Sequence, residues 1–62
     1  MKVRVFELRD GRYREAGMCQ EDGRYSGEPW LGPVLAGLVR RHGPEGAAKR
    51  ISSGLLEARL EP

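Results

Sequence analysis

The sequence predicts an α+β fold, in which a small antiparallel β-meander is followed by helices and a closing strand. Three observations support this class. β-Branched and aromatic residues are concentrated near the N-terminus, Asp-Gly pairs interrupt that region twice, and apolar residues recur at helical spacing further on. With 62 residues, the chain is expected to form one small domain (residues 1–62) near the lower size limit for independent folding.

A three-stranded meander is predicted in the N-terminal part. The segment KVRVFEL is rich in side chains that favour strands. Asp10-Gly11 follows it and favours a type I′ turn, because that turn needs a positive φ at both central residues. The tetrapeptide DGRY begins at Asp10 and again at Asp22, so we expect the same turn chemistry at both places. The predicted strands cover about residues 2–8, 12–19 and 24–26.

A two-residue turn at Asp10-Gly11 fixes the register of the first hairpin. It places Leu8 opposite Tyr13 and Glu7 opposite Arg14, and the second pair is a favourable cross-strand ion pair. An uninterrupted register then divides the side chains between two faces. One face is expected to hold Val3, Val5, Ala16 and Met18, and the other Phe6, Leu8 and Tyr13 together with Lys2, Arg4 and Cys19.

Apolar side chains on both faces of one hairpin have three explanations. A β-bulge between Val5 and Phe6 would return both sets to one side. One helix could cover each face of the sheet. Alternatively, the face with Phe6, Leu8 and Tyr13 could contact a second chain. The residue pattern leaves all three open, and the third makes these three side chains a candidate interaction surface.

The main helix is predicted at about residues 33–42. Pro33 suits the first helical position, where a missing N–H is harmless. Basic residues at the C-terminal end interact favourably with the helix dipole, and Gly43-Pro44 ends the helix. The core-facing stripe is expected to consist of Trp30, Leu31, Val34, Leu35, Leu38 and Val39, which lie at helical spacing.

A short second helix is predicted at about residues 44–52. Pro44 at its start and Glu45 in its first turn favour it, and Ser52-Ser53-Gly54 is expected to end it. The tail LLEARLEP fits either a strand at about residues 55–60 or a continued helix. Leu56, Ala58 and Leu60 alternate with charged residues, and Gly54 disfavours a continued helix, so the strand is preferred. This strand would pair with the N-terminal strand or lie at the edge of the sheet.

The predicted core is small for a protein that folds alone. Cys19 is the only cysteine, so the chain forms no internal disulfide, and His42 is the only histidine, which leaves too few ligands for a zinc cage. Small domains without such links commonly bury surface against another polypeptide. We therefore expect a homodimer or other homo-oligomer, or a protein partner.

A cytoplasmic location is expected. A single thiol does not require an oxidising compartment, and the sequence has no signal-peptide pattern. No apolar run approaches the roughly 20 residues that a membrane-spanning helix needs, so no membrane association is expected.

No residue pattern indicates catalysis, a metal or a cofactor. A nucleophilic Cys19 would need an activating base and an orienting group, and nothing brings His42 close to it. The glycines lack the Lys-Ser/Thr sequence that completes a phosphate-binding loop. The sequence thus predicts a non-catalytic interaction module.

Nucleic-acid binding is the alternative function. A sheet that carries arginine and tyrosine can bind phosphates and stack bases. Carboxylates interrupt the predicted patch, however, and the formal net charge of the whole chain is only +2. Arg40-Arg41 with Lys49-Arg50 could form a second basic spot. The candidate contacts on the meander are Arg4, Arg12, Arg14, Arg24 and Tyr25.

Overall fold

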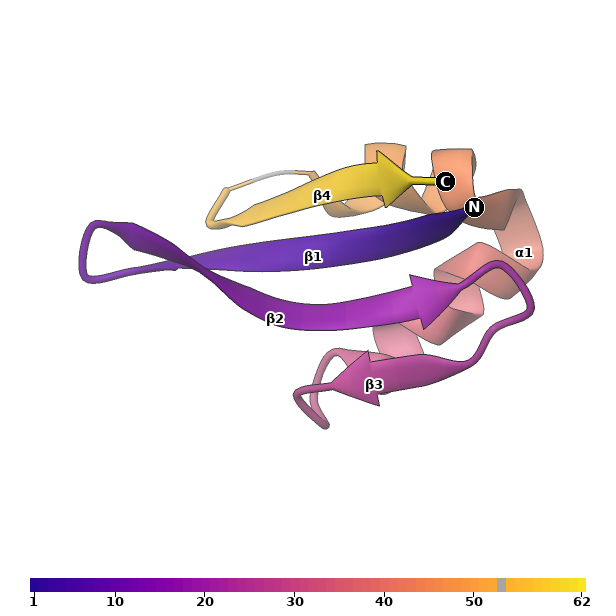
Figure 1. Cartoon of the computed structure of the whole chain (residues 1–62), viewed down its shortest axis with the longest axis horizontal. Helices are drawn as coiled ribbons and strands as arrows, with labels where there is room; N and C mark the ends of the chain where they lie inside the picture. Colours follow the sequence, from indigo (N-terminus) through magenta and orange to yellow (C-terminus); the bar gives the residue numbers. More distant parts are fainter. Residues whose placement is uncertain (53) are drawn as a thin grey trace.

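The computed structural model describes residues 1–52 and 54–62. Within them, four strands form one antiparallel sheet in the order β3-β2-β1-β4, and a helix packs against it (Figure 1). This arrangement confirms the predicted α+β class, the meander and the closing C-terminal strand. The elements are β1 (Lys2–Arg9), β2 (Arg12–Gln20), β3 (Tyr25–Gly27), α1 (Gly32–Ile51) and β4 (Leu56–Glu61).

The two Asp-Gly pairs form different turns. Asp10 and Gly11 have φ values of 50° and 77°, as the predicted type I′ turn requires. At the second turn only Gly23 has a positive φ, 95°. There the N–H of Gly23 donates to the carbonyl of Gln20 (2.9 Å), and the N–H of Gln20 donates to the carbonyl of Arg24 (2.8 Å). The expectation of the same turn twice is therefore wrong, because four residues, 21–24, connect β2 to β3, whereas only Asp10 and Gly11 connect β1 to β2.

A bulge interrupts the pairing of β1 with β2. The predicted pairs from Arg9–Arg12 to Phe6–Glu15 are present, but the register shifts between Val5 and Phe6. Val5 then pairs with Gly17, so that Ala16 is the extra residue on β2. One extra residue reverses the faces of all later side chains on that strand.

The bulge changes which β2 side chain enters the core. Cys19, and not Met18, pairs with Val3 and is fully buried on the face that packs against α1. The predicted face assignments of Cys19 and Met18 were therefore wrong. Phe6 stays on the opposite face from Val5, since β1 itself alternates regularly, so the bulge does not return the two apolar sets to one side.

One stripe of α1 forms the helical part of the core. Leu31, Leu35 and Val39 lie four residues apart and are nearly inaccessible. Trp30 and Val34, which we expected in the same stripe, are 49% and 53% exposed; Trp30 precedes α1, and Val34 lies on the neighbouring row of the helix. Ala36 is buried beside this row, and Leu38, another residue of the expected stripe, is partly buried and packs against the core. The opposing side chains of the sheet are Val3, Val5, Ala16 and Cys19.

The two predicted helices form one element with an interruption at Gly43. This residue has φ 76° and ψ 172°, which is not helical, and α1 continues from Pro44 to Ile51 in a new direction. The glycine is required there because other residues rarely adopt this φ. Ala47 and Ile51 extend the core after the kink. The helix ends at Ile51 with Ser52 as its C-cap, as the Ser-Ser-Gly sequence predicted; Ser53 lies outside the described residues.

Candidate interaction surface

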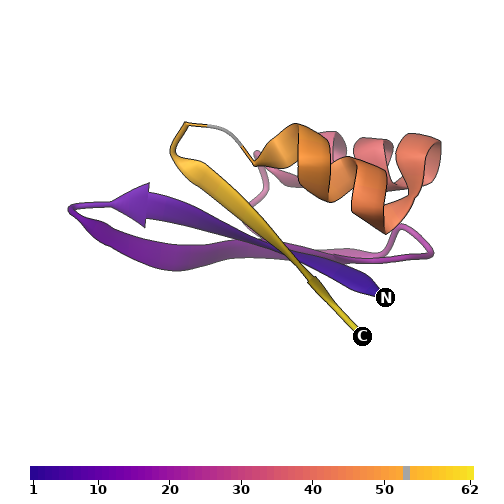
Figure 2. The same cartoon turned by 90° about the horizontal axis from the view of Figure 1, so that it is seen from above.

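Helix α1 covers only one face of the sheet. Figure 2 shows the helix on one side and the strands β1, β2 and β4 with their other side free of any described element. The expectation that a helix could cover each face is therefore wrong for the described residues. We call the side of the sheet that faces away from α1 the open face.

The side chains of the open face follow from strand alternation and register. Arg4, Phe6 and Leu8 alternate with the buried residues Val3 and Val5 on β1. The pairing then places their cross-strand partners on the same face. The members used below are Arg4, Phe6 and Leu8 of β1, Tyr13 and Glu15 of β2, and Glu57, Arg59 and Glu61 of β4.

Phe6, Leu8 and Tyr13 form an apolar strip at the hairpin end of the open face. Leu8 and Tyr13 are direct partners, and Phe6 is two residues from Leu8 on β1. Tyr13 is 52% exposed, whereas Phe6 and Leu8 are half-buried. None of the three belongs to the core cluster beneath α1 or packs against it. The structure thus places the three predicted interaction residues together on a surface that α1 does not reach.

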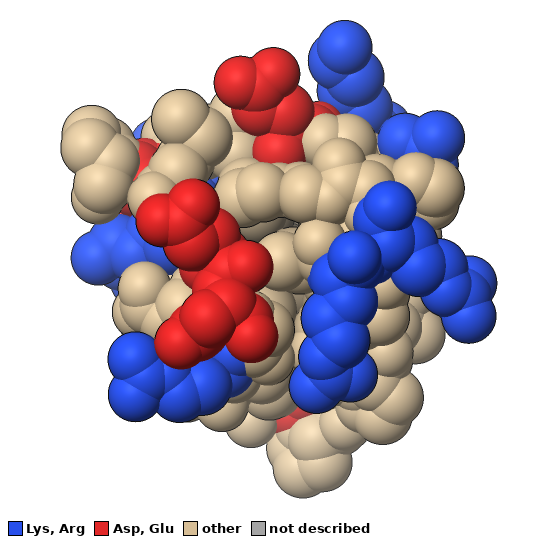
Figure 3. Space-filling view, turned by 90° about the vertical axis from the view of Figure 1, so that its right-hand side faces the viewer, with Lys and Arg blue, Asp and Glu red and all other residues tan. Residues whose placement is uncertain are grey.

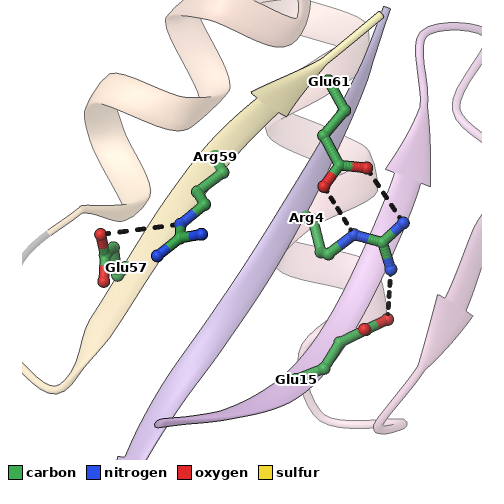
Figure 4. Close-up of polar contacts among 5 residues, drawn as sticks. All are labelled: Arg4, Glu15, Glu57, Arg59 and Glu61. Atoms are coloured by element: carbon green, nitrogen blue, oxygen red, sulfur yellow. Dashed lines mark hydrogen bonds and ion pairs between the residues drawn. The ribbon is translucent and has the colours of Figure 1, made fainter.

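An ion-pair network lies beside the strip. The guanidinium of Arg4 bonds both carboxylate oxygens of Glu61, at 2.9 and 3.0 Å, and one oxygen of Glu15 at 2.7 Å (Figure 4). The hydrogen bond from Arg4 holds the pKa of the Glu61 carboxyl below its ordinary value, and the same bond raises the pKa of Arg4. Three strands, β1, β2 and β4, are therefore cross-linked on the open face by one arginine.

Arg59 connects β4 to the apolar strip. Its guanidinium carbon lies 5.1 Å from the centre of the Phe6 ring, within the range of a cation–π interaction. Its Nε is 3.9 Å from a carboxylate oxygen of Glu57, a loose ion pair (Figure 4). Arg59 and Glu57 are both more than two-fifths exposed, so these groups remain accessible to another molecule.

The five residues predicted to contact nucleic acid are not brought together. Arg4 is neutralised by two carboxylates, and Arg24 pairs with Asp22 at 2.9 Å. Tyr25 faces the helix side, where its ring approaches Gly17 and its hydroxyl donates to the carbonyl of Glu28 at 2.6 Å. Arg12 and Arg14 share the face opposite to Arg4, since Arg14 pairs with Glu7.

Cys19 lies in the core. Its side chain is fully buried, and its Sγ is 3.4 Å from the carbonyl of Gln20. Burial raises the pKa of the thiol, and the positive charge of Arg40 offsets only part of this effect. His42, the base that a nucleophilic cysteine would need, has an exposed side chain next to the kink of α1. This environment disfavours a thiolate.

The described residues offer little for metal or ligand chemistry. Among residues 1–52 and 54–62, no three His, Cys, Asp or Glu side chains are placed to share a metal ion. A shallow depression of about 250 Å³ lies between β2 and β3 and is open to solvent. It is lined by Met18, Gln20, Arg24, Tyr25 and Ser26.

Among the same described residues, no helix has the length and apolar character to cross a membrane.

Charge is distributed unevenly between the two sides of the molecule. Figure 3 shows an end view in which one group of basic side chains, on the right, lies apart from the carboxylates, while other basic side chains lie directly beside them on the left. Helix α1 carries four basic residues, Arg40, Arg41, Lys49 and Arg50, against the single carboxylate of Glu45. The open face has nearly balanced charges, because Arg4 and Arg59 lie among Glu15, Glu57 and Glu61.

Strand β4 is an edge of the sheet. Because it pairs with β1 alone, its second side has no strand beside it among the described residues. The N–H of Ala58 on this side donates to Oγ of Ser52 at 3.2 Å. Sequence reasoning placed this strand at an edge or beside the first strand, and both are correct. The sequence did not identify the free edge as a candidate site, because alternation in LEARLE indicates a half-buried strand but not which of its sides is paired.

Comparison with known proteins finds no matching family model, no similar curated protein and no similar solved structure.

Proposed function

We propose that this protein is a non-catalytic interaction module that acts through self-association, as a homodimer, or through a protein partner, with the open face as its contact surface. The single observation that carries the proposal is the apolar strip on a sheet face that α1 leaves uncovered. Antiparallel sheets tolerate water on one face when that face is polar. Here Phe6, Leu8 and Tyr13 are adjacent on it, and burying them against another protein is favourable.

The charges around the strip favour a protein over a nucleic acid as the occupant. Arg4 already binds two carboxylates, and Arg59 lies near a third. A phosphate backbone would have to displace these carboxylates or approach them closely, which is unfavourable. A protein surface with both charge signs and an apolar centre fits the face without that cost. Nucleic-acid binding through Arg4, Arg12, Arg14, Arg24 and Tyr25 therefore has less support.

Two further properties belong to this proposal. The absence of catalysis is supported by the buried Cys19, whose raised pKa disfavours the nucleophilic thiolate. A cytoplasmic location is supported by the same residue, since a single buried thiol neither needs nor uses an oxidising compartment.

Association as a function of concentration tests the proposal. Sedimentation velocity of the intact chain is expected to show self-association that Tyr13→Ser weakens, because this change removes the most exposed aromatic ring of the strip. Val34→Ser is the matched control, since Val34 is 53% exposed on α1, away from the open face. Equal effects of the two variants, or none from Tyr13→Ser, would argue against the open face as the contact surface.

A further inference from the structure

We propose that two copies of this chain pair through their β4 edges, antiparallel and centred on Ala58, to form one continuous sheet. The inference rests on the proposed function in one respect, self-association, and adds to the open face a second contact surface, the β4 edge, with its own register. An edge strand with free backbone groups is a ready template for another strand. The occupant is argued from the sequence of β4 itself, which is complementary to its own reverse.

The backbone of β4 alternates between bonds to β1 and groups that point away. The N–H of Leu8 donates to the carbonyl of Leu55 at 2.8 Å, and Leu8 and Leu55 extend the same β1–β4 register. In an antiparallel ladder, every second residue bonds the neighbouring strand, so Leu55, Glu57, Arg59 and Glu61 face β1. The bond from the N–H of Ala58 to Ser52 confirms the outward direction of the groups between them. The outward groups belong to Leu56, Ala58 and Leu60.

One register gives hydrogen bonds to these outward backbone groups and also places the side chains in favourable cross-strand pairs. With Ala58 opposite the partner's Ala58, Leu56 lies opposite the partner's Leu60, and each such pair can exchange two hydrogen bonds. On the open face, Glu57 then lies opposite the partner's Arg59, and symmetry supplies the same ion pair a second time. Every residue from Leu56 to Leu60 therefore has a favourable partner.

The neighbouring registers are disfavoured by charge. Moving the partner by two residues in one direction places Arg59 opposite the partner's Arg59 and Glu57 opposite the partner's Glu61. Moving it in the other direction places Glu57 opposite the partner's Glu57. Like charges directly opposite each other are destabilising. A shift by one residue fails for another reason, because it opposes outward and inward backbone groups and exchanges the two faces.

Burial and charge at the edge agree with this register. Leu60 is 40% exposed on the helix side, and the partner's Leu56 would cover it. Glu57 and Arg59 are 43% and 64% exposed and form only a loose pair with each other, so each can bind across the interface. Because the two-fold axis is perpendicular to the sheet, both helices lie on one side and both open faces on the other. The dimer therefore presents one open face of double width.

Ser52 defines the cost of association. In the single chain, the Oγ of Ser52 accepts the hydrogen bond from the outward N–H of Ala58. In the dimer, that N–H donates instead to the carbonyl of the partner's Ala58. The side chain of Ser52 must turn away as the partner strand arrives. A single strand pair also buries far less than the roughly 1,200–2,000 Å² of a stable standard interface. The dimer is accordingly weak, with a dissociation constant on the order of micromolar to millimolar.

A charge swap on β4 tests the register. Glu57→Arg and Arg59→Glu each place like charges at both symmetric pairs, and each is expected to weaken the dimer by about tenfold in sedimentation equilibrium. Mixing the two variants in equal amounts restores opposite charges at both pairs, so the mixture associates like the original chain. The double variant E57R/R59E also regains self-association. Circular dichroism of each variant checks that the fold is retained.

Ala58→Pro provides an independent variant. It removes the outward N–H without removing a bond to β1, and proline is tolerated at an edge on the solvent side. Loss of dimerisation with an unchanged circular dichroism spectrum supports the proposal. Dimerisation unaffected by the charge variants or by Ala58→Pro would overturn the β4 pairing while leaving self-association through the open face intact. A wild-type chain that stays monomeric up to about 1 mM would overturn both the pairing and self-association.

Discussion

Replacing Leu35 with alanine tests the assignment of the helix face. Leu35 is completely inaccessible at the centre of the contact between α1 and the sheet. Truncating a buried leucine costs about 2–5 kcal/mol, from lost transfer free energy and the cavity that remains. A chain of this size has a free energy of unfolding of about 3–9 kcal/mol at roughly 0.05–0.15 kcal/mol per residue. Leu35→Ala is therefore expected to remove a large share of the free energy of unfolding of the chain.

Val34→Ala in the same turn of α1 is the control. Val34 is 53% exposed, and alanine has the higher helix propensity, so this variant is expected to stay within about 0.5 kcal/mol of the original chain. Urea denaturation followed by circular dichroism at 222 nm measures both variants. A loss of stability in Val34→Ala equal to that in Leu35→Ala would refute the assignment of the buried row to Leu31, Leu35 and Val39.

Three further predictions concern Cys19, Arg4 and nucleic acid. A thiol reagent should label Cys19 of the original chain about a hundredfold more slowly than the single cysteine at position 18 of the C19S/M18C variant. This ratio corresponds to a cost of about 3 kcal/mol for opening the core around Cys19. Equal labelling rates would contradict the position of the bulge. Because Arg4 lowers the pKa of Glu61, their interaction stabilises the fold above the ordinary value of 4.5 and is lost as the pH falls through the lowered pKa. In Arg4→Met, thermal unfolding should lose less stability between neutral and acidic pH than in the original chain; an unchanged pH profile would contradict this. An oligonucleotide titration at low salt should show only weak binding that Arg4→Met leaves unchanged, whereas a marked loss would revive the nucleic-acid alternative.

The elements with strong local chemistry were predictable from the sequence. Asp10-Gly11 specified the first hairpin because few other residue pairs accept two consecutive positive φ values. Gly43-Pro44 predicted an interruption of the helix, and the kink is at Gly43. Leu56, Ala58 and Leu60 predicted a strand, because alternation with charged residues indicates a half-buried sheet.

The details that failed depend on tertiary packing. Nothing local distinguishes Ala16 as the extra residue on β2, yet this bulge decides that Cys19 rather than Met18 enters the core. Trp30 and Val34 fit the apolar spacing as well as Leu31 and Leu35 do, and only contact with the sheet selects between the rows. The second turn differs from the first because its register depends on the pairing of β2 with β3.

The candidate site was partly predictable. Phe6, Leu8 and Tyr13 were assigned to one face from the hairpin register, and the structure places them together on the open face. The network of Arg4 with Glu15 and Glu61 was not foreseen, because it joins residues 57 positions apart in the chain. Its formation required β4 to pair with β1 in a particular register, which no local pattern specifies.

The central claim is that another polypeptide completes the exposed side of the sheet. Amide chemical shifts in ¹⁵N-labelled protein, followed on dilution from about 1 mM to about 20 µM, test it most directly. We predict shifts concentrated at Phe6, Leu8 and Tyr13 and along β4, with Val34 on α1 unchanged. Spectra that do not change with concentration at any of these positions would contradict self-association through this side of the sheet.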